Sequence, residues 1–400
     1  MRCGDAASLA AALVHGRGEL LALFDGFEQA LGRGGLHIAY DPLLNLPLWE
    51  LGHIGWFEEH WLARNGQRGR GAACDPLHPR AASLLPGADA LYDSSKVTHP
   101  TRWSLPLLDA AATRRYLAAV REGTLGLLRT SGFDDDALYF FRWVLFHEDM
   151  HREAWHFMAQ QLGIDLGPAM MRRGPRAATA QGEWHLPATR IRLGSTDAGF
   201  AFDNEIGAHT PAIKAFSIDR APVDWSRFLP FVEADGYADA RWWSPAGRAW
   251  RGLHGAHHPR HLRRHGRSWQ QQRFGGWEPL DEATPALHLT AFEAEAWCHW
   301  AGRRLPTETE WELAATRAPA AGEAFEWGEV WEWTASAFAP FPGFVPHPYR
   351  DYSAPWFDGR PVLRGGSFAT APRMKHPRYR NFFEAHRSDV FAGFRSCAAD

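Results

Sequence analysis

One uninterrupted stretch, Phe133–Leu162, constrains the fold more than any other part of the chain. It contains no proline or glycine and is rich in apolar and aromatic residues, so it predicts a single long helix. His147 and His151 lie within it, and side chains four residues apart point the same way from a helix. Because neutral imidazole is a common metal ligand, the pair predicts part of a metal site. The alternative is a chance spacing, since the chain holds 21 histidines.

The composition is that of an ordinary globular protein, with 45% hydrophobic and 22% charged residues. A length of 400 residues predicts about two domains. The net charge of -3 gives no reason to expect nucleic acid or an anionic membrane as a partner. No apolar run approaches the ~20 residues that span a bilayer, and the N-terminus has no signal-peptide core. The four cysteines form no metal-spaced pair, so we expect reduced thiols in a cytoplasmic protein.

Three further segments of the N-terminal half have helical patterns. Apolar residues recur at helical spacing over residues 8–32, a second helix begins near Pro47, and a third covers residues 110–131. With the stretch that holds the histidine pair, they predict a four-helix bundle, a fold that builds metal sites from side chains on facing helices. His53 shares an aromatic face of the second helix and becomes a candidate third ligand. The alternative is a histidine buried in the core.

The motif Leu48-Trp49-Glu50-Leu51-Gly52-His53, taken together with His147-x-x-x-His151, resembles the DinB-like domain of the ergothioneine sulfoxide synthase family. In that family, three histidines at the positions of His53, His147 and His151 hold a non-haem iron. The resemblance therefore implies Fe(II) as cofactor and O₂ as co-substrate. Imidazole ligands alone suit zinc, copper, iron or nickel equally well.

A change in composition separates the two halves of the chain. Residues 167–182 are rich in proline, glycine, arginine and alanine and have little periodicity, which is typical of a linker. We therefore expect a helical domain at residues 1–170, a linker at 171–185 and a second domain at 186–400.

The second domain alternates short strands and helices. Strands are expected at Ile191–Gly194 and Phe216–Ile218, followed by a helix at 291–300 and another capped by Thr307, with Glu310 completing a capping box. This set resembles the formylglycine-generating-enzyme fold, an irregular α+β domain related to C-type lectins. The copper-binding cysteine pair of those enzymes has no counterpart here. The expected fold class is thus multidomain, an α bundle followed by an α+β domain.

Within the second domain, the resemblance implies roles for four residues. Tyr349 and Tyr352 match two catalytic-site tyrosines: the first can donate a proton or hydrogen near the iron, and the second helps to hold the imidazole substrate. Asn381 and Phe382 match residues that bind the carboxylate and trimethylammonium of a betaine, and Phe383 follows them. The alternative for both tyrosines is that they only fill the core.

The implied acceptor is hercynine, the trimethyl betaine of histidine, and the implied reaction bonds sulfur or selenium to its imidazole C2. Sulfoxide synthases commonly have glutamine where this chain has Met150, and some have an acidic residue where it has Phe383. An apolar side chain cannot hold the ammonium of an amino-thiol donor. These changes resemble the related selenoneine synthases, which use a selenosugar. Selenoneine synthase is therefore the first interpretation. An ergothioneine sulfoxide synthase using cysteine or γ-glutamylcysteine is the second, with Arg102 as a further substrate-binding candidate.

Two other classes of protein fit part of the pattern. A DinB-type metal-dependent hydrolase or thiol transferase would use the histidines with a zinc-bound water or thiolate and would not need the second domain. A lectin-like binding module would hold a structural metal with closed coordination and no turnover. Iron content and O₂ consumption that depends on hercynine distinguish both from the oxidative enzyme.

Overall fold

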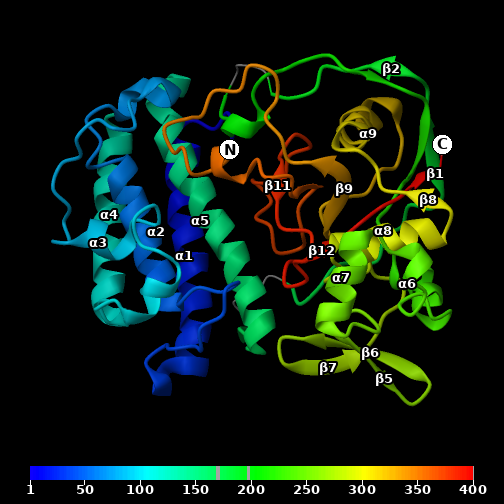
Figure 1. Ribbon diagram of the computed structural model, residues 1–400. Coiled ribbons are helices and arrows are strands. Elements are labelled where there is room, and N and C mark those ends of the chain that lie inside the picture. The colour runs from blue at the N-terminus through cyan, green and yellow to red at the C-terminus, as the bar shows by residue number, and fades with distance from the viewer. Residues whose placement is uncertain (168–171, 196–198, 400) are drawn as a thin grey trace. The chain divides into compact units, whose positions relative to one another are not determined.

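The computed structural model describes residues 1–167, 172–195 and 199–399 (Figure 1). The chain forms two compact units. The first consists of Met1–Met170, Asp197–Ala201 and Pro346–Tyr352, and the second of Met171–Thr196, Phe202–Val345 and Ser353–Asp400. The main boundary lies near the expected linker. The chain then returns twice to the first unit, through segments that the sequence alone assigned to residues 186–400.

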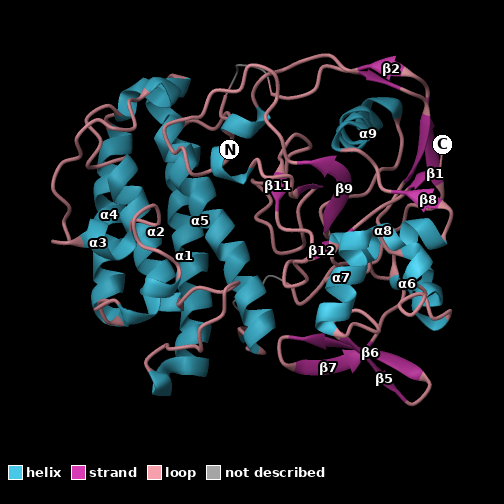
Figure 2. Ribbon diagram, in the orientation of Figure 1, coloured by secondary structure: helices cyan, strands magenta, loops and turns pink. Residues whose placement is uncertain are grey.

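Among its described residues, the first unit contains four long helices, and the expected bundle is confirmed. Figure 2 draws these helices in cyan. The helices are α1 (Ala6–Leu31), α2 (Pro47–Trp61), α4 (Ala110–Arg129) and α5 (Asp135–Leu162), with the short α3 (Ala88–Tyr92) between them. Short 3-10 turns cover Gly32–Gly34, Arg68–Ala73 and Pro100–Ser104.

Local chemistry explains where these helices begin and end. Asp5, Asp109 and Asp134 precede α1, α4 and α5, and each accepts a hydrogen bond from a backbone N–H of the first turn, at 2.7–2.8 Å. Pro47 opens α2, where its missing N–H costs nothing. Gly163 ends α5 in the left-handed conformation, with φ of 66°.

Helix α1 differs from expectation in one respect. By length and composition alone it could cross a membrane, although no such segment was expected from the sequence. In this structure it is a helix of the bundle core, because one of its faces is buried. The buried apolar residues of that face are Leu9, Leu13, Leu20, Leu23, Phe24 and Phe27.

An ionic quartet joins the four long helices. It consists of Arg17 from α1, Glu58 from α2, Arg121 from α4 and Glu148 from α5, all buried. Arg17 contacts Glu58 at 2.8 Å and Glu148 at 2.9 Å, and Arg121 contacts the same two carboxylates at 2.8 and 2.7 Å. Burial on its own raises the pKa of Glu58, but the positive charges of Arg121 and Arg17 outweigh burial and lower this pKa to about 2. Two positive and two negative charges therefore cancel inside the bundle.

The second unit is an α+β domain with four small sheets, which confirms the expected fold class. The strand orders are β1-β4-β13-β8, β11-β10-β9-β12, β2-β3 and β5-β6-β7. The strands are β1 (Glu183–Leu186), β2 (Thr189–Arg190), β3 (Ala212–Ile213), β4 (Phe216–Asp219), β5 (Leu262–His265), β6 (Ser268–Arg273), β7 (Gly276–Pro279), β8 (Arg303–Arg304), β9 (Trp331–Ala337), β10 (Pro361–Arg364), β11 (Asn381–Phe382), β12 (Ala392–Gly393) and β13 (Cys397–Ala398). Its helices are α6 (Trp225–Glu233), α7 (Pro245–His254), α8 (Ala291–Trp300) and α9 (Glu308–Ala321).

Local predictions for this unit are mostly correct. The strand at 216–218, the helix at 291–300 and the Thr307–Glu310 capping box are all present. The strand expected at Ile191–Gly194 is wrong. Only Leu193 pairs there, in an isolated bridge with His209, because the ladder of β2 lies two residues earlier. Strand β1 also begins inside the expected linker.

Candidate metal centre

Three histidines converge in the first unit. His53 on α2 and His147 and His151 on α5 each offer one nitrogen, and these nitrogens lie within 4.8 Å of one another. The Nε2 atoms of His147 and His151 are 3.2 Å apart. His53 and His147 are buried, whereas His151 is half-buried. We call this set the histidine triad, and it brings together the three ligands expected from the sequence.

Aromatic rings fix the planes of two of these imidazoles. Trp49 stacks on His53 with ring centroids 5.0 Å apart and an interplanar angle of 8°. Phe57 stacks on His147 at 3.6 Å and 6°. Both aromatic residues belong to α2, one turn on either side of His53, so the helix that supplies one ligand also orients a second.

Hydrogen bonds set the tautomers. His53 Nδ1 donates to the backbone carbonyl of Tyr92 at 2.8 Å, and His151 Nδ1 donates to Glu50 Oε1 at 2.5 Å. A neutral imidazole that donates from Nδ1 keeps a lone pair on Nε2, which is the arrangement that metal-binding histidines use. Sequence reasoning missed Glu50. Its position one turn before His53 in the same motif was the available signal.

Burial keeps two of the three imidazoles, His53 and His147, neutral. It lowers the pKa of His53 to about 3, with His151 adding to the effect, and it lowers the pKa of His147 well below the usual value. Neutral imidazoles bind metals and protonated ones do not. The donor set therefore fits a divalent transition metal such as iron, zinc or copper.

Tyr349 lies beside the triad. Its ring meets Phe57 edge-on at 5.0 Å and 80°, and Phe57 is the ring that stacks on His147. Trp143 lies 5.4 Å from Tyr349 and 5.0 Å from Tyr352. Burial raises the pKa of Tyr349 to about 12, although a hydrogen bond from Ser94 opposes this shift. The structure thus places both tyrosines in the first unit with the histidines.

Arg102 is a half-buried cation near the triad. Its guanidinium stacks 3.8 Å above the Trp49 ring and donates to Asn45 Oδ1 at 2.5 Å. Its Nε is buried without a hydrogen-bond partner, and no ion pair with a carboxylate occurs within the described ranges. Burial lowers its pKa, whereas Glu50 and Tyr349 raise it. Arg102 also lines a cavity of about 320 Å³, with Leu48 and Trp103 in its wall.

The remaining expected site residues divide between the two units. Met150 is half-buried on α5, between the two histidine ligands. Asn381, Phe382 and Phe383 belong to the second unit, where Phe382 stacks on Phe338 at 4.0 Å and 15°. The Asn381 side chain accepts from the N–H of Phe382 at 2.9 Å, and Phe383 lies 5.0 Å from the guanidinium of Arg387.

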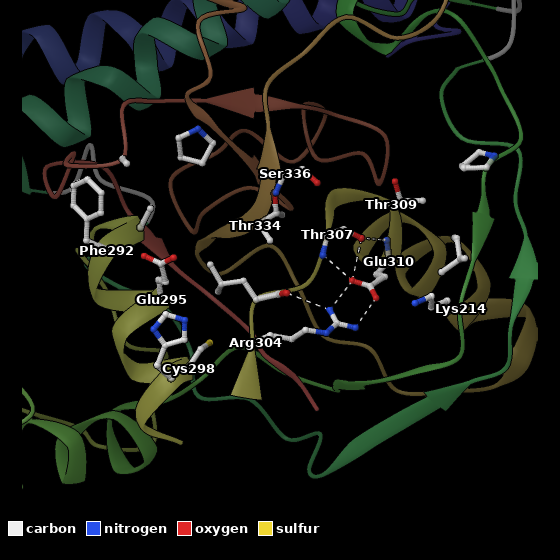
Figure 3. A pocket seen from close by; sticks show the side chains of 18 of the residues that line it. Lys214, Phe292, Glu295, Cys298, Arg304, Thr307, Thr309, Glu310, Thr334 and Ser336 are labelled. Atoms are coloured by element: carbon white, nitrogen blue, oxygen red, sulfur yellow. Dashed lines mark hydrogen bonds and ion pairs between the residues drawn. The ribbon is translucent and has the colours of Figure 1, made fainter. Parts of the chain in front are cut away.

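The second unit has a larger pocket of its own, of about 800 Å³, between α8 and the start of α9 (Figure 3). Arg304 in its wall forms two contacts with Glu310, at 2.9 and 2.7 Å, so these charges are already paired. None of the site residues expected from the sequence lines this pocket. The chemistry of the histidine triad, rather than cavity size, therefore identifies the candidate site.

Comparison with known proteins agrees with this architecture. Residues 12–154 match the DinB superfamily, and residues 175–329 and 326–400 match the Sulfatase-modifying factor enzyme 1-like domain. Hercynine oxygenase of Mycobacterium tuberculosis is 35% identical over 97% of both chains. The chain belongs to the hercynine oxygenase family.

Other relatives show how the family is assembled. Hercynine oxygenase of Mycolicibacterium smegmatis is also 35% identical, over 90% of this chain and 92% of its own. Formylglycine-generating enzyme of Streptomyces coelicolor is 29% identical over 41% of this chain and 54% of its own. Similarity to hercynine oxygenases thus spans both units. Similarity to that formylglycine-generating enzyme covers only part of the chain.

Proposed function

We propose that this protein is an iron- and O₂-dependent enzyme that bonds a sulfur or selenium donor to C2 of the hercynine imidazole. The histidine triad carries this proposal, because it offers three converging imidazole nitrogens, which would hold a transition metal without filling its coordination. Membership of the hercynine oxygenase family supports iron as the metal and hercynine as the acceptor.

Iron bound by the triad would supply O₂ activation and a common binding point for donor and acceptor. The chain's part is to orient its ligands and to control protons. Glu50 and the Tyr92 carbonyl hold the Nδ1 protons of His151 and His53, which directs both Nε2 lone pairs towards the centre. Tyr349 keeps its phenolic proton at neutral pH, because burial raises its pKa to about 12. This shift disfavours binding as a phenolate and leaves a hydroxyl that can donate a hydrogen bond, or a proton to a strongly basic group, on a substrate.

Two donors fit this reaction. A cysteine-type thiol is supported by Arg102, because a half-buried guanidinium that forms no ion pair among the described residues suits a donor carboxylate. A selenosugar is favoured by Met150 and Phe383, whose apolar side chains offer nothing to the ammonium of an amino-thiol. A selenosugar has no ionised group, so its recognition would rest on hydroxyl groups meeting Arg102 and on aromatic contacts.

A competition experiment tests both the function and the donor. The full chain is reconstituted with Fe(II) without oxygen and mixed with hercynine and equal amounts of γ-glutamylcysteine and a selenosugar. O₂ is then added, and the products are identified by mass spectrometry. We expect a hercynine adduct at C2 and O₂ consumption that requires hercynine. A sulfoxide product assigns the thiol, and a selenium-bearing product assigns the selenosugar. Iron-loaded protein that forms neither adduct and consumes no O₂ contradicts the proposal.

The zinc-loaded protein is the control for the hydrolase alternative. Zinc has no redox chemistry and fits the same imidazole set. We expect the zinc form to be inactive in the competition experiment. Turnover by the zinc form alone would favour a hydrolase or thiol transferase instead.

A further inference from the structure

The segment Pro346–Tyr352 is a short return of the second half of the chain to the first unit. Val345 before it and Ser353 after it belong to the second unit. The segment contains bends and turns but no helix or strand, with backbone hydrogen bonds from Arg350 to Pro348 and from Tyr352 to Tyr349. A backbone without regular structure has few hydrogen bonds of its own, so side-chain contacts must determine where it lies.

One directional contact ties this segment to helix α5. The hydroxyl of Tyr139 lies 2.8 Å from Nδ1 of His347, and the two residues are 208 positions apart in sequence. Tyr139 is 6% exposed, and its ring meets the imidazole at 5.6 Å and 70°. Burial lowers the pKa of His347 to about 4, so its ring is neutral and Nδ1 can accept a hydrogen bond from the Tyr139 hydroxyl.

Helix α5 links this contact to the histidine triad. Tyr139 precedes His147 on the same helix by about two turns, or roughly 12 Å along its axis. The hydrogen bond therefore fixes the segment against the same rigid element that carries two of the ligands. Tyr349 follows His347 by two residues, and its ring meets both Phe57 and Trp143 edge-on.

The other contacts of Tyr349 are mostly aromatic. Rings at 5.0–6.3 Å surround it, from Phe57, Trp61 and Trp143. Such contacts limit where the ring lies, but they fix its orientation less strictly than a hydrogen bond would, since aromatic pairs tolerate a broad range of geometries. Ser94 contacts only the hydroxyl end. The Tyr139–His347 hydrogen bond is therefore a directional contact only two residues away from Tyr349 on its own segment.

We propose that Tyr139 and His347 are positioning residues whose hydrogen bond fastens the segment Pro346–Tyr352 to α5 and sets the place of the Tyr349 hydroxyl beside the histidine triad. The fastening is a property of the fold. Its effect on catalysis rests on the proposed function.

The test is Tyr139→Phe, which removes one hydroxyl and keeps the ring. The full chain is loaded with zinc, and 3-fluorotyrosine is placed at position 349 and observed by ¹⁹F NMR. We expect one narrow resonance in the parent protein and a shifted, broadened or doubled resonance in the variant. Tyr116→Phe is the matched control, because it removes another buried hydroxyl of the first unit, one that donates to Glu59 at 2.7 Å. The control spectrum should match the parent.

His347→Asn is the second variant, because the asparagine side-chain oxygen can take the place of Nδ1 as acceptor. It should restore most of the parent spectrum, whereas His347→Ala should resemble Tyr139→Phe. An unchanged ¹⁹F spectrum in both Tyr139→Phe and His347→Ala overturns the proposal. Thermal unfolding of each variant shows that the bundle is intact.

Activity measurements distinguish the fastening of the segment Pro346–Tyr352 from its effect on catalysis. With the iron-loaded protein, we expect Tyr139→Phe to lower kcat by roughly tenfold with KM nearly unchanged, since small misplacements of a reacting group slow turnover. If the ¹⁹F spectrum changes but the parent protein forms no hercynine product, the proposed function fails and the fastening stands. If the parent is active and Tyr139→Phe leaves both kcat and the spectrum unchanged, the positioning role fails.

Discussion

The first unit buries both the ionic quartet and the histidine triad, and the two clusters use the same helices differently. In the quartet, every guanidinium meets both carboxylates at 2.7–2.9 Å, so the charges are satisfied from within. In the triad, burial keeps His53 and His147 neutral, and the nitrogens of the three histidines lie within 4.8 Å of one another. The first cluster is complete as folded. The histidine triad has the donor set of a metal site, and we expect a metal ion to bind there.

The two clusters are also neighbours along the chain. Glu58 follows His53 on α2, and Glu148 follows His147 on α5. The contacts that hold α2 and α5 in register through Arg17 and Arg121 therefore also determine how the imidazoles meet. The paired charges thus hold the helices together, and the converging imidazoles on two of the same helices form the candidate site.

The largest expected effect comes from removing a ligand of the triad. His151→Ala deletes one of three imidazoles, so bound iron should fall from about one per chain to near zero, because two helix ligands do not make a stable site. Metal analysis after gel filtration measures this. His15→Ala, which removes an exposed histidine of α1, is the control and should keep its iron. Full iron content in His151→Ala would show that the triad is not the site.

The next largest effect comes from removing one charge of the ionic quartet. Glu148→Gln leaves Arg17 and Arg121 buried with one carboxylate between them, which should lower the free energy of unfolding by about 3–5 kcal/mol. Urea denaturation of the metal-free protein measures the change. Asp25→Asn, at an exposed partner of Arg114, should change it by less than about 1 kcal/mol. Equal effects of the two substitutions would remove the distinction drawn between buried and exposed pairs.

Acidification should separate the clusters by pH. The folded pKa of His53 is about 3, below its unfolded value of 6.5, so the unfolded chain binds the proton first. The metal-free protein should therefore lose stability as the pH falls below 6.5, by about 1.4 kcal/mol per pH unit for this group. Glu58 has a folded pKa of about 2, below its unfolded value of 4.5. Its contribution is present above pH 4.5 and is lost as the pH falls through 2.

Urea denaturation of the metal-free protein at pH 7, 6 and 5 tests the upper window. His53→Gln removes one of several buried histidines that titrate in this window, so it should reduce the slope by about 1.4 kcal/mol per pH unit, the share of one group, while leaving the loss below pH 4.5. A slope that His53→Gln leaves unchanged between pH 7 and 5 would mean that other histidines carry it.

The parts of the site that the sequence predicts are the local ones. Helix spacing predicts that His147 and His151 face the same way, and helical patterns predict the bundle that adds His53. The rest depends on partners far apart in the chain. Arg17 and Glu148 are 131 residues apart, so no local pattern marks the quartet. The return of Tyr349 to the first unit is hidden for the same reason, because a short irregular segment carries no periodicity that names its neighbours.

The smallest expected effect comes from the carboxylate that orients His151 in the histidine triad. Glu50→Gln keeps the size of the side chain and an oxygen that accepts from His151 Nδ1, but removes the negative charge. Partners of this kind raise the basicity of a metal-binding imidazole, so metal affinity should fall by about 10- to 100-fold. Competition with a chelator measures it. Glu59→Gln is the matched control, because Glu59 lies on the same helix, is equally buried and accepts from Ser83 and Tyr116 rather than from a histidine. If both substitutions weaken metal binding alike, the effect is a general one of lost buried charge. A loss confined to Glu50→Gln shows that the histidine triad depends on the negative charge of Glu50 to bind metal, whereas the charges of the ionic quartet balance one another.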